Sequence, residues 1–127
     1  LQAWRVQNWL WQCGRNDFAR LMQSASSERL QVSIHPSASI GASVYLDHAT
    51  GIIIGALSVI GDEATIMQNV TIGRGPDNPA RAPRVGRGVL LASGSSVIGD
   101  IEVDVPIDLK LVLGAGDQPI ELPLGVG

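Results

Sequence analysis

The sequence repeats an aliphatic residue every six positions over most of its length. From position 34 the chain divides into hexads such as IHPSAS, IGASVY and IGALSV, with one two-residue insertion and one loop. On an α-helix this period would turn successive aliphatic residues by about 600°, away from any single stripe. Hexads with small residues at the corners instead predict a triangular parallel β-helix, in which three hexads make one coil. The hexads begin with the following residues, which we expect to point inward: Ile34, Ile40, Leu46, Ile54, Ile60, Ile66, Ile72, Val85, Leu91 and Val97.

The two ends of the chain lack this repeat. Bulky residues near the N-terminus recur at helical spacing, and we expect short helices over about 2–13 and 16–25, followed by a polar joint at 24–27. After position 103 the hexads decay and three prolines interrupt the pattern. The sequence therefore predicts three parts: an α-helical cap over 1–32, an all-β domain folded as a parallel β-helix over 33–103, and divergent final strands and a tail over 104–127.

Composition narrows the class of protein. A chain of 127 residues with 45% hydrophobic residues suits one folded domain. A net charge of −3 argues against nucleic-acid binding, and the chain has no apolar run long enough to span a membrane. The lone Cys13 favours a reducing compartment, so we expect a cytoplasmic protein. No motif has the spacing of metal ligands, and we expect no metal.

Four arginines lie close together between positions 74 and 87. In an acidic chain, such a cluster fits either the binding of an anionic small molecule or a loop held by salt bridges.

Three stretches of the chain resemble the catalytic half of the serine acetyltransferases, which are hexapeptide-repeat enzymes. They read SIHPSASIGASVYLDHATGIIIG, IMQNVTIGRG and ARAPRVGRGVLLASGSSVIGDIEV, and the LDHATG motif is the most specific part. The resemblance implies a left-handed β-helix and acetyl transfer from acetyl-CoA to the hydroxyl of L-serine, in cysteine biosynthesis. It also implies a homotrimer, or a multiple of trimers, with acetyl-CoA between subunits. The long helical domain that usually precedes the β-helix has no counterpart in this sequence.

His48, in the LDHATG motif, is the candidate catalytic residue. Neutral imidazole is a suitable base near pH 7, although residue chemistry alone leaves a surface or packing histidine open. The resemblance implies that His48 is the general base, that Asp47 holds the amino group of serine, and that Arg81 pairs with its carboxylate. Asp47 could also be a corner cap or a salt-bridge partner. Because neighbours on a strand point to opposite faces, we expect Asp47 not to orient the His48 ring within one chain.

We expect coenzyme A to lie along Gly73, Arg74, Ala92 and Ser93. The resemblance matches Ala92 and Ser93 to a strip of small residues, whereas Arg74 stands where the family has glycine. An arginine could meet its phosphates, and small residues let the pantetheine arm approach the backbone. Each of these residues also has a purely structural interpretation, because solvated loop charges and small corner residues are common in any β-helix.

The chain departs from the family at three polar positions of the site. Ser33, Ala56 and Ala82 stand where the family has an aspartate, a glutamate and a histidine. A carboxylate beside a catalytic base fixes the tautomer of its ring, and Ser33 carries no charge. Two alternatives therefore stay open: an acetyltransferase for another hydroxyl acceptor, such as a sugar, and a catalytically silent trimeric homologue. We expect His35 to be structural.

Overall fold

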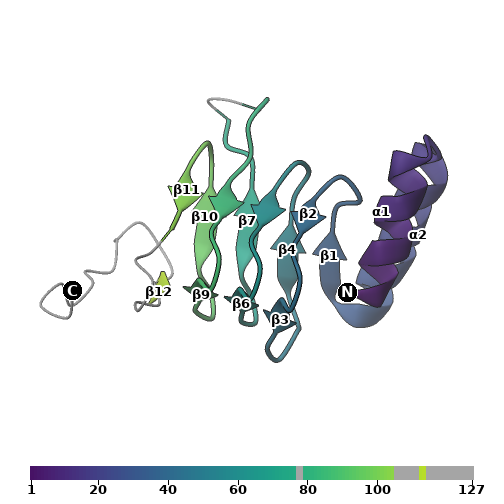
Figure 1. The fold of residues 1–127 in the computed structure, drawn as a ribbon. Helices are drawn as coiled ribbons and strands as arrows, with labels where there is room; N and C mark the ends of the chain where they lie inside the picture. Colours follow the sequence, from purple (N-terminus) through teal and green to yellow (C-terminus); the bar gives the residue numbers. More distant parts are fainter. Residues whose placement is uncertain (77–78, 105–111, 114–127) are drawn as a thin grey trace, which may run out of the picture.

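The computed structural model describes residues 1–76, 79–104 and 112–113. Two helices, α1 (Gln2–Gln12) and α2 (Asn16–Leu30), lie at one end of a stack of coils (Figure 1). Short strands make up the coils. They are β1 (Val32–Ile34), β2 (Ser39–Ile40), β3 (Tyr45–Leu46), β4 (Ile52–Ile54), β5 (Val59–Ile60), β6 (Thr65–Ile66), β7 (Thr71–Gly73), β8 (Arg84–Val85), β9 (Leu90–Leu91), β10 (Ser96–Ile98), β11 (Glu102–Val103) and β12 (Val112–Leu113).

The strands form three parallel sheets. Sheet I has the order β1-β4-β7-β10, sheet II contains β2, β5, β8 and β11, and sheet III contains β3, β6, β9 and β12. Each strand pairs with the strand three places later in the chain, so three strands complete one coil. This topology confirms the parallel β-helix that the hexads predict. We name the three corners of the prism after the sheets that they join: the I–II, II–III and III–I edges.

Both interruptions of the repeat fall at edges. Ile54 lies beside Ile72, eighteen residues on, which is the length of three hexads. Ile34 lies beside Ile54, twenty residues on, because two extra residues extend the III–I edge of the first coil. Ile72 lies beside Val97, because a longer segment enters at the I–II edge between β7 and β8. The sheets continue through both insertions, and the described part of the longer segment stands out from the coils (Figure 1).

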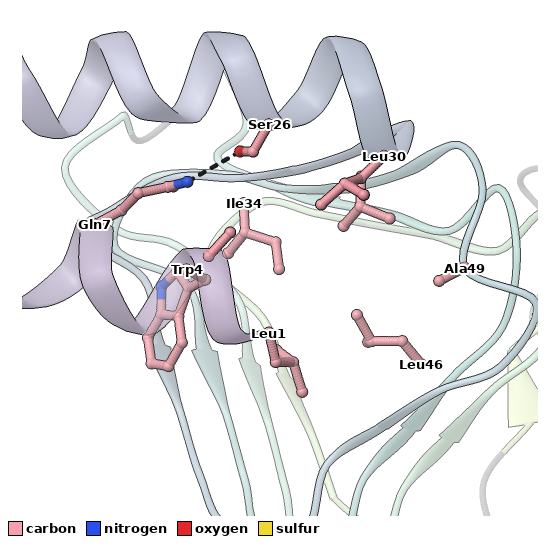
Figure 2. Close-up of a pocket in the computed structure, with 10 residues that line it drawn as sticks. Leu1, Trp4, Gln7, Ser26, Leu30, Ile34, Leu46 and Ala49 are labelled. Carbon is pink, nitrogen blue, oxygen red and sulfur yellow. Dashed lines mark hydrogen bonds between the residues drawn. The ribbon is translucent and has the colours of Figure 1, made fainter.

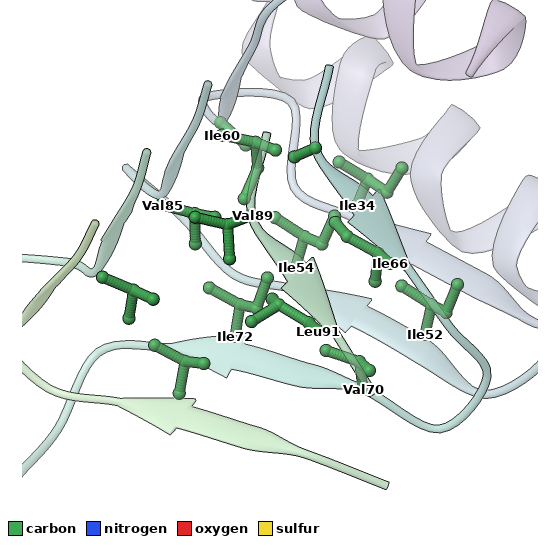
Figure 3. Close-up of a cluster of buried hydrophobic side chains, with 14 of the residues drawn as sticks. Ile34, Ile52, Ile54, Ile60, Ile66, Val70, Ile72, Val85, Val89 and Leu91 are labelled. Carbon is green, nitrogen blue, oxygen red and sulfur yellow. The ribbon is translucent and has the colours of Figure 1, made fainter. Parts of the chain in front are cut away.

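The leading aliphatic residues stack inside the prism (Figure 3). Ile54 is 1% exposed, whereas its neighbour Ile53 points outward and is 48% exposed. Full burial of such a side chain stabilises the fold by about 1.5–3 kcal/mol. Ile40 and Leu46 are only half-buried, since they belong to the first coil and have a neighbouring coil on one side only.

The helices cover the open end of the first coil. Trp4 joins the core cluster, and Asn8 Nδ2 donates a hydrogen bond to the carbonyl of Pro36 at 2.8 Å. α2 runs on to Leu30, so the predicted end at residue 25 and the polar joint at 24–27 are wrong. The serines do not break the helix, because the hydroxyl of Ser26 donates back to the carbonyl of Gln23 at 3.1 Å. The helix ends where Gln31 adopts a left-handed φ of 57°.

Aspartates brace two edge turns from one coil away. Asp62 Oδ1 accepts a hydrogen bond from the backbone N–H of Ala42 at 2.8 Å. A Cβ atom on Gly41 would overlap that carboxylate, so the turn requires glycine. Asp104 approaches Gly86 in the same way.

Replacement of an inward residue should be far more costly than replacement of its outward neighbour. We expect Ile60→Ala, at a site that is 1% exposed, to lower the free energy of unfolding by about 2–5 kcal/mol, because it leaves a cavity between coils. Val59→Ala, at an outward site on the same strand, should cost less than about 1 kcal/mol. Denaturant unfolding of both variants measures the difference, and equal losses would contradict the assignment of faces.

Candidate active site

Asp47 and His48 lie in the turn at the III–I edge of the first coil. β3 ends at Leu46, and His48 has a left-handed φ of 48°. The carbonyl of His48 accepts a hydrogen bond from the N–H of Thr50 at 2.6 Å, which closes the turn. The His48 side chain is 78% exposed, and its Nε2 lies 3.7 Å from Asp47 Oδ1. Strand alternation, on which we based the expectation that Asp47 does not orient the His48 ring, does not apply here, because the two residues belong to a turn and their side chains lie close together. No hydrogen bond joins the Asp47 carboxylate to the ring at this distance.

This arrangement presents an imidazole to solvent with a carboxylate beside it. Such a pair can accept a proton on the ring and stabilise the imidazolium that results. Ser33 does not supply a charge, and its hydroxyl accepts a hydrogen bond from Gln23 Nε2 of α2 at 3.2 Å. Among the described residues, Asp47 is the carboxylate that pairs with His48.

Ala92 and Ser93 lie on the same edge, in the third coil. The N–H of Asp47 donates to the carbonyl of Ile66, and the N–H of Met67 donates to the carbonyl of Leu91. The turns that follow β3, β6 and β9 are therefore stacked in register along this edge. Two coil spacings correspond to about 10 Å along the axis.

Gln68 lies in the second coil, between His48 and Ser93 along this edge. Its Oε1 is buried and has no hydrogen-bond partner in the part of the chain that the structure describes. Gln68 is not among the site residues predicted from the sequence. Its place in the hexad register, one coil beyond His48, is the signal that could have identified it.

Gly73, Arg74 and Arg81 lie on a different edge, I–II, in the third coil. Arg74 Nη1 donates a hydrogen bond to the carbonyl of Pro79 at 2.9 Å. Arg81 Nε lies 3.5 Å from Asp100 Oδ1. Of the two interpretations of the arginine cluster, the loop held by salt bridges matches these contacts. The Arg81 side chain is still 59% exposed in its ion pair with Asp100.

Within one chain, the candidate residues of the III–I edge and those of the I–II edge lie apart. Sheet I separates the III–I edge from the I–II edge, and its three-residue strands span about 10 Å. His48 belongs to the first coil and Arg81 to the third, which adds a similar distance along the axis. The predicted base and the predicted carboxylate-binding arginine therefore lie on two separate surfaces of one chain.

A cavity of about 210 Å³ lies between the helices and the first coil (Figure 2). It is smaller than the roughly 300–1,000 Å³ of typical ligand pockets. Leu46 and Ala49, which flank the Asp47–His48 turn, contribute to its wall, while Gln7 and Ser26 are joined by a hydrogen bond of 2.9 Å. None of the predicted site residues lines the cavity. We therefore interpret it as a packing gap beneath the cap.

Comparison with known proteins identifies the relatives of this chain. No family model matches it. It is 44% identical over 104 residues to the serine acetyltransferase of Salmonella typhimurium, and 43% identical over 103 residues to chloroplastic serine acetyltransferase 1 of Arabidopsis thaliana. These matches cover 81% and 80% of this chain, and 38% and 33% of the relatives. The chain is homologous to the serine acetyltransferases. It spans about two fifths of the length of the bacterial relatives.

Crystal structures of serine acetyltransferases have the same fold. The enzyme of Brucella abortus in complex with coenzyme A gives a TM-score of 0.81 at 34% identity, over 94% of this chain and 53% of that one. The enzyme of Vibrio cholerae gives a TM-score of 0.79 at 40% identity, over 91% of this chain and 43% of that one. This similarity confirms the left-handed parallel β-helix with an N-terminal helical part.

Across residues 1–76, 79–104 and 112–113, no three histidine, cysteine or acidic side chains gather where they could hold a metal ion. Neither of the helices in these ranges has both the length and the apolar character of a membrane span.

His35 is held in the fold as a neutral ring. Its Nδ1 accepts a hydrogen bond from the backbone N–H of Ser37 at 3.0 Å, and its ring packs edge-on against Trp11 at 5.0 Å. Burial lowers the pKa of His35, and the charges of Arg20 and Arg74 lower it further. These contacts agree with a structural role.

The lowered pKa of His35 should make the fold sensitive to acid. As pH falls below about 6.5, the unfolded chain binds a proton at His35 that the folded chain resists, so stability is lost from that value down to the folded pKa. We expect His35→Asn, which keeps a side-chain acceptor, to lose less stability between pH 7.5 and pH 5 than the wild type loses. Denaturant unfolding at both pH values measures this, and an equal loss in both proteins would contradict it.

Proposed function

We propose that this chain carries the acetyl-transferring β-helix of an enzyme that moves the acetyl group of acetyl-CoA to the hydroxyl of L-serine. The observation that supports this most strongly is the exposed His48 imidazole beside Asp47, in a chain homologous to serine acetyltransferases. One related structure holds coenzyme A, and another serine acetyltransferase structure, with a TM-score of 0.73 at 38% identity, holds cysteine. Cysteine differs from serine in one atom, sulfur in place of the hydroxyl oxygen.

In the proposed reaction, neutral His48 accepts the proton of the serine hydroxyl. The oxygen attacks the thioester carbonyl carbon, the carbon–sulfur bond breaks, and the departing thiolate takes the proton from the imidazolium. Asp47, 3.7 Å from the ring, holds the ammonium group of serine and stabilises the imidazolium. Backbone N–H groups stabilise the developing oxyanion. Arg81 pairs with the serine carboxylate.

The separation of the two edges supports a site shared between copies of the chain. We propose a homotrimer, or a multiple of trimers, in which the III–I edge of one subunit faces the I–II edge of the next. Coenzyme A then lies in the groove between them, against Ala92 and Ser93 of one subunit and against Gly73 and Arg74 of its neighbour. Apolar side chains that project from sheet I between these edges, such as Ile53 and Ile98, are suited to contact with a neighbouring subunit.

We assign residues 1–32 to the cap and 33–103 to the β-helix. The proposed tail, 104–127, lies almost entirely outside the described residues. We place the reaction in the cytoplasm, in cysteine biosynthesis, since the exposed lone Cys13 suits a reducing compartment.

Loss of the base should abolish most of the reaction. We expect His48→Ala to reduce serine-dependent thiol release from acetyl-CoA by at least about 100-fold, because general-base catalysis contributes on that scale. His35→Asn should retain activity within a few-fold, since the contacts of His35 with Ser37 and Trp11 give it a structural role.

Thiol release with and without L-serine measures this effect, and sedimentation checks that the variants keep the assembly of the wild type. A His48→Ala protein that turned over at the rate of the wild type would contradict the assignment. Wild-type protein that acetylated a sugar in preference to serine would contradict the choice of acceptor.

A further inference from the structure

Asp100 lies at the I–II edge of the fourth coil, next to the arginines of the coil before. The backbone below it is tightly packed. The N–H of Gly99 donates to the carbonyl of Gly73 at 2.9 Å, and a Cβ atom on buried Gly75 would lie 3.1 Å from the Cα of Gly99. The N–H of Ile101 in turn donates to the carbonyl of Gly99 at 3.0 Å. Asp100 therefore projects from a backbone that its neighbours hold in place.

The Asp100 carboxylate is shared by two arginines. Its Oδ1 lies 3.3 Å from Arg84 Nη1 and 3.5 Å from Arg81 Nε. Glu102 lies 3.9 Å from Arg84 Nε and forms no ion pair with Arg81 among the described residues. Among the described residues, Asp100 is thus the acidic side chain that pairs with Arg81, and Glu102 is a nearby acid of the same charge that does not.

This pair has a consequence for substrate binding. Arginine binds a carboxylate best through two parallel N–H groups. An acid that is already paired at Nε leaves the guanidinium fewer N–H donors for a second carboxylate. We propose that Asp100 sets the affinity of the acceptor site by competing with the carboxylate of the incoming amino acid for Arg81. The inference rests on the function proposed above, and it assigns a specificity role to a residue that does not touch the reacting atoms.

The competition should be weak enough for substrate to overcome. Arg81 and Asp100 are both partly exposed, and exposed ion pairs of this kind change equilibria by a small factor. We expect Asp100→Asn to lower the KM for L-serine by about 2- to 5-fold, with kcat unchanged. Calorimetric titration of L-serine without acetyl-CoA should show the dissociation constant falling by the same factor.

Glu102→Gln is the matched control. It removes one negative charge from the same cluster without touching the Arg81 contact, and it should leave the KM for serine unchanged. A second variant, Asp100→Ser, should shift the KM in the same direction as Asp100→Asn. Thermal unfolding and sedimentation check that the variants are folded and assembled.

The outcomes separate this proposal from the function on which it rests. An unchanged KM in a folded Asp100→Asn protein would overturn the competition, and a raised KM would mean that Asp100 instead holds Arg81 ready for substrate. An equal fall in the KM for L-serine in the Glu102→Gln protein would overturn the competition in favour of a general effect of charge. Wild-type protein without serine-dependent thiol release would overturn the proposed function and this inference together.

Discussion

Burial of one coil by the next is the interaction on which the whole structure depends. No single coil can bury its inward residues, so Ile54, Ile60 and Ile66 leave solvent only because coils lie on both sides of them. Within the described residues, stacking in register confines the two interruptions of the repeat to the edges, where no ladder is broken. They are the turn at 47–51, which carries Asp47 and His48, and the segment between β7 and β8, which carries Arg81.

A rigid prism also limits what one chain can do alone. The strands of sheet I hold His48 and Arg81 apart, and a packed core cannot bend to bring them together. Arg81 and Arg84 at the I–II edge are already paired within the chain, through Asp100. On this account, a second copy completes the site, and the internal ion pairs set how readily a carboxylate enters it.

Much of the fold could be predicted from the hexads, because their leading residues identify both the core and the register. The Asp47–His48 contact could not be predicted by strand alternation, since it depends on the left-handed φ of His48. The length of α2 was missed because serines that donate back to helix carbonyls do not end a helix. Asp100 belongs to the next coil, so its contact with Arg81 appears only when the coils are placed in register.

Mixing two inactive variants tests most directly whether the site is shared between subunits. His48→Ala and Arg81→Ala subunits, co-expressed in equal amounts, form neighbouring pairs at random. If the site takes His48 from one subunit and Arg81 from the next, about a quarter of the sites contain both intact residues. We therefore expect the mixture to regain about a quarter of the wild-type rate of serine-dependent thiol release. A mixture no more active than either variant alone would contradict a site shared between subunits.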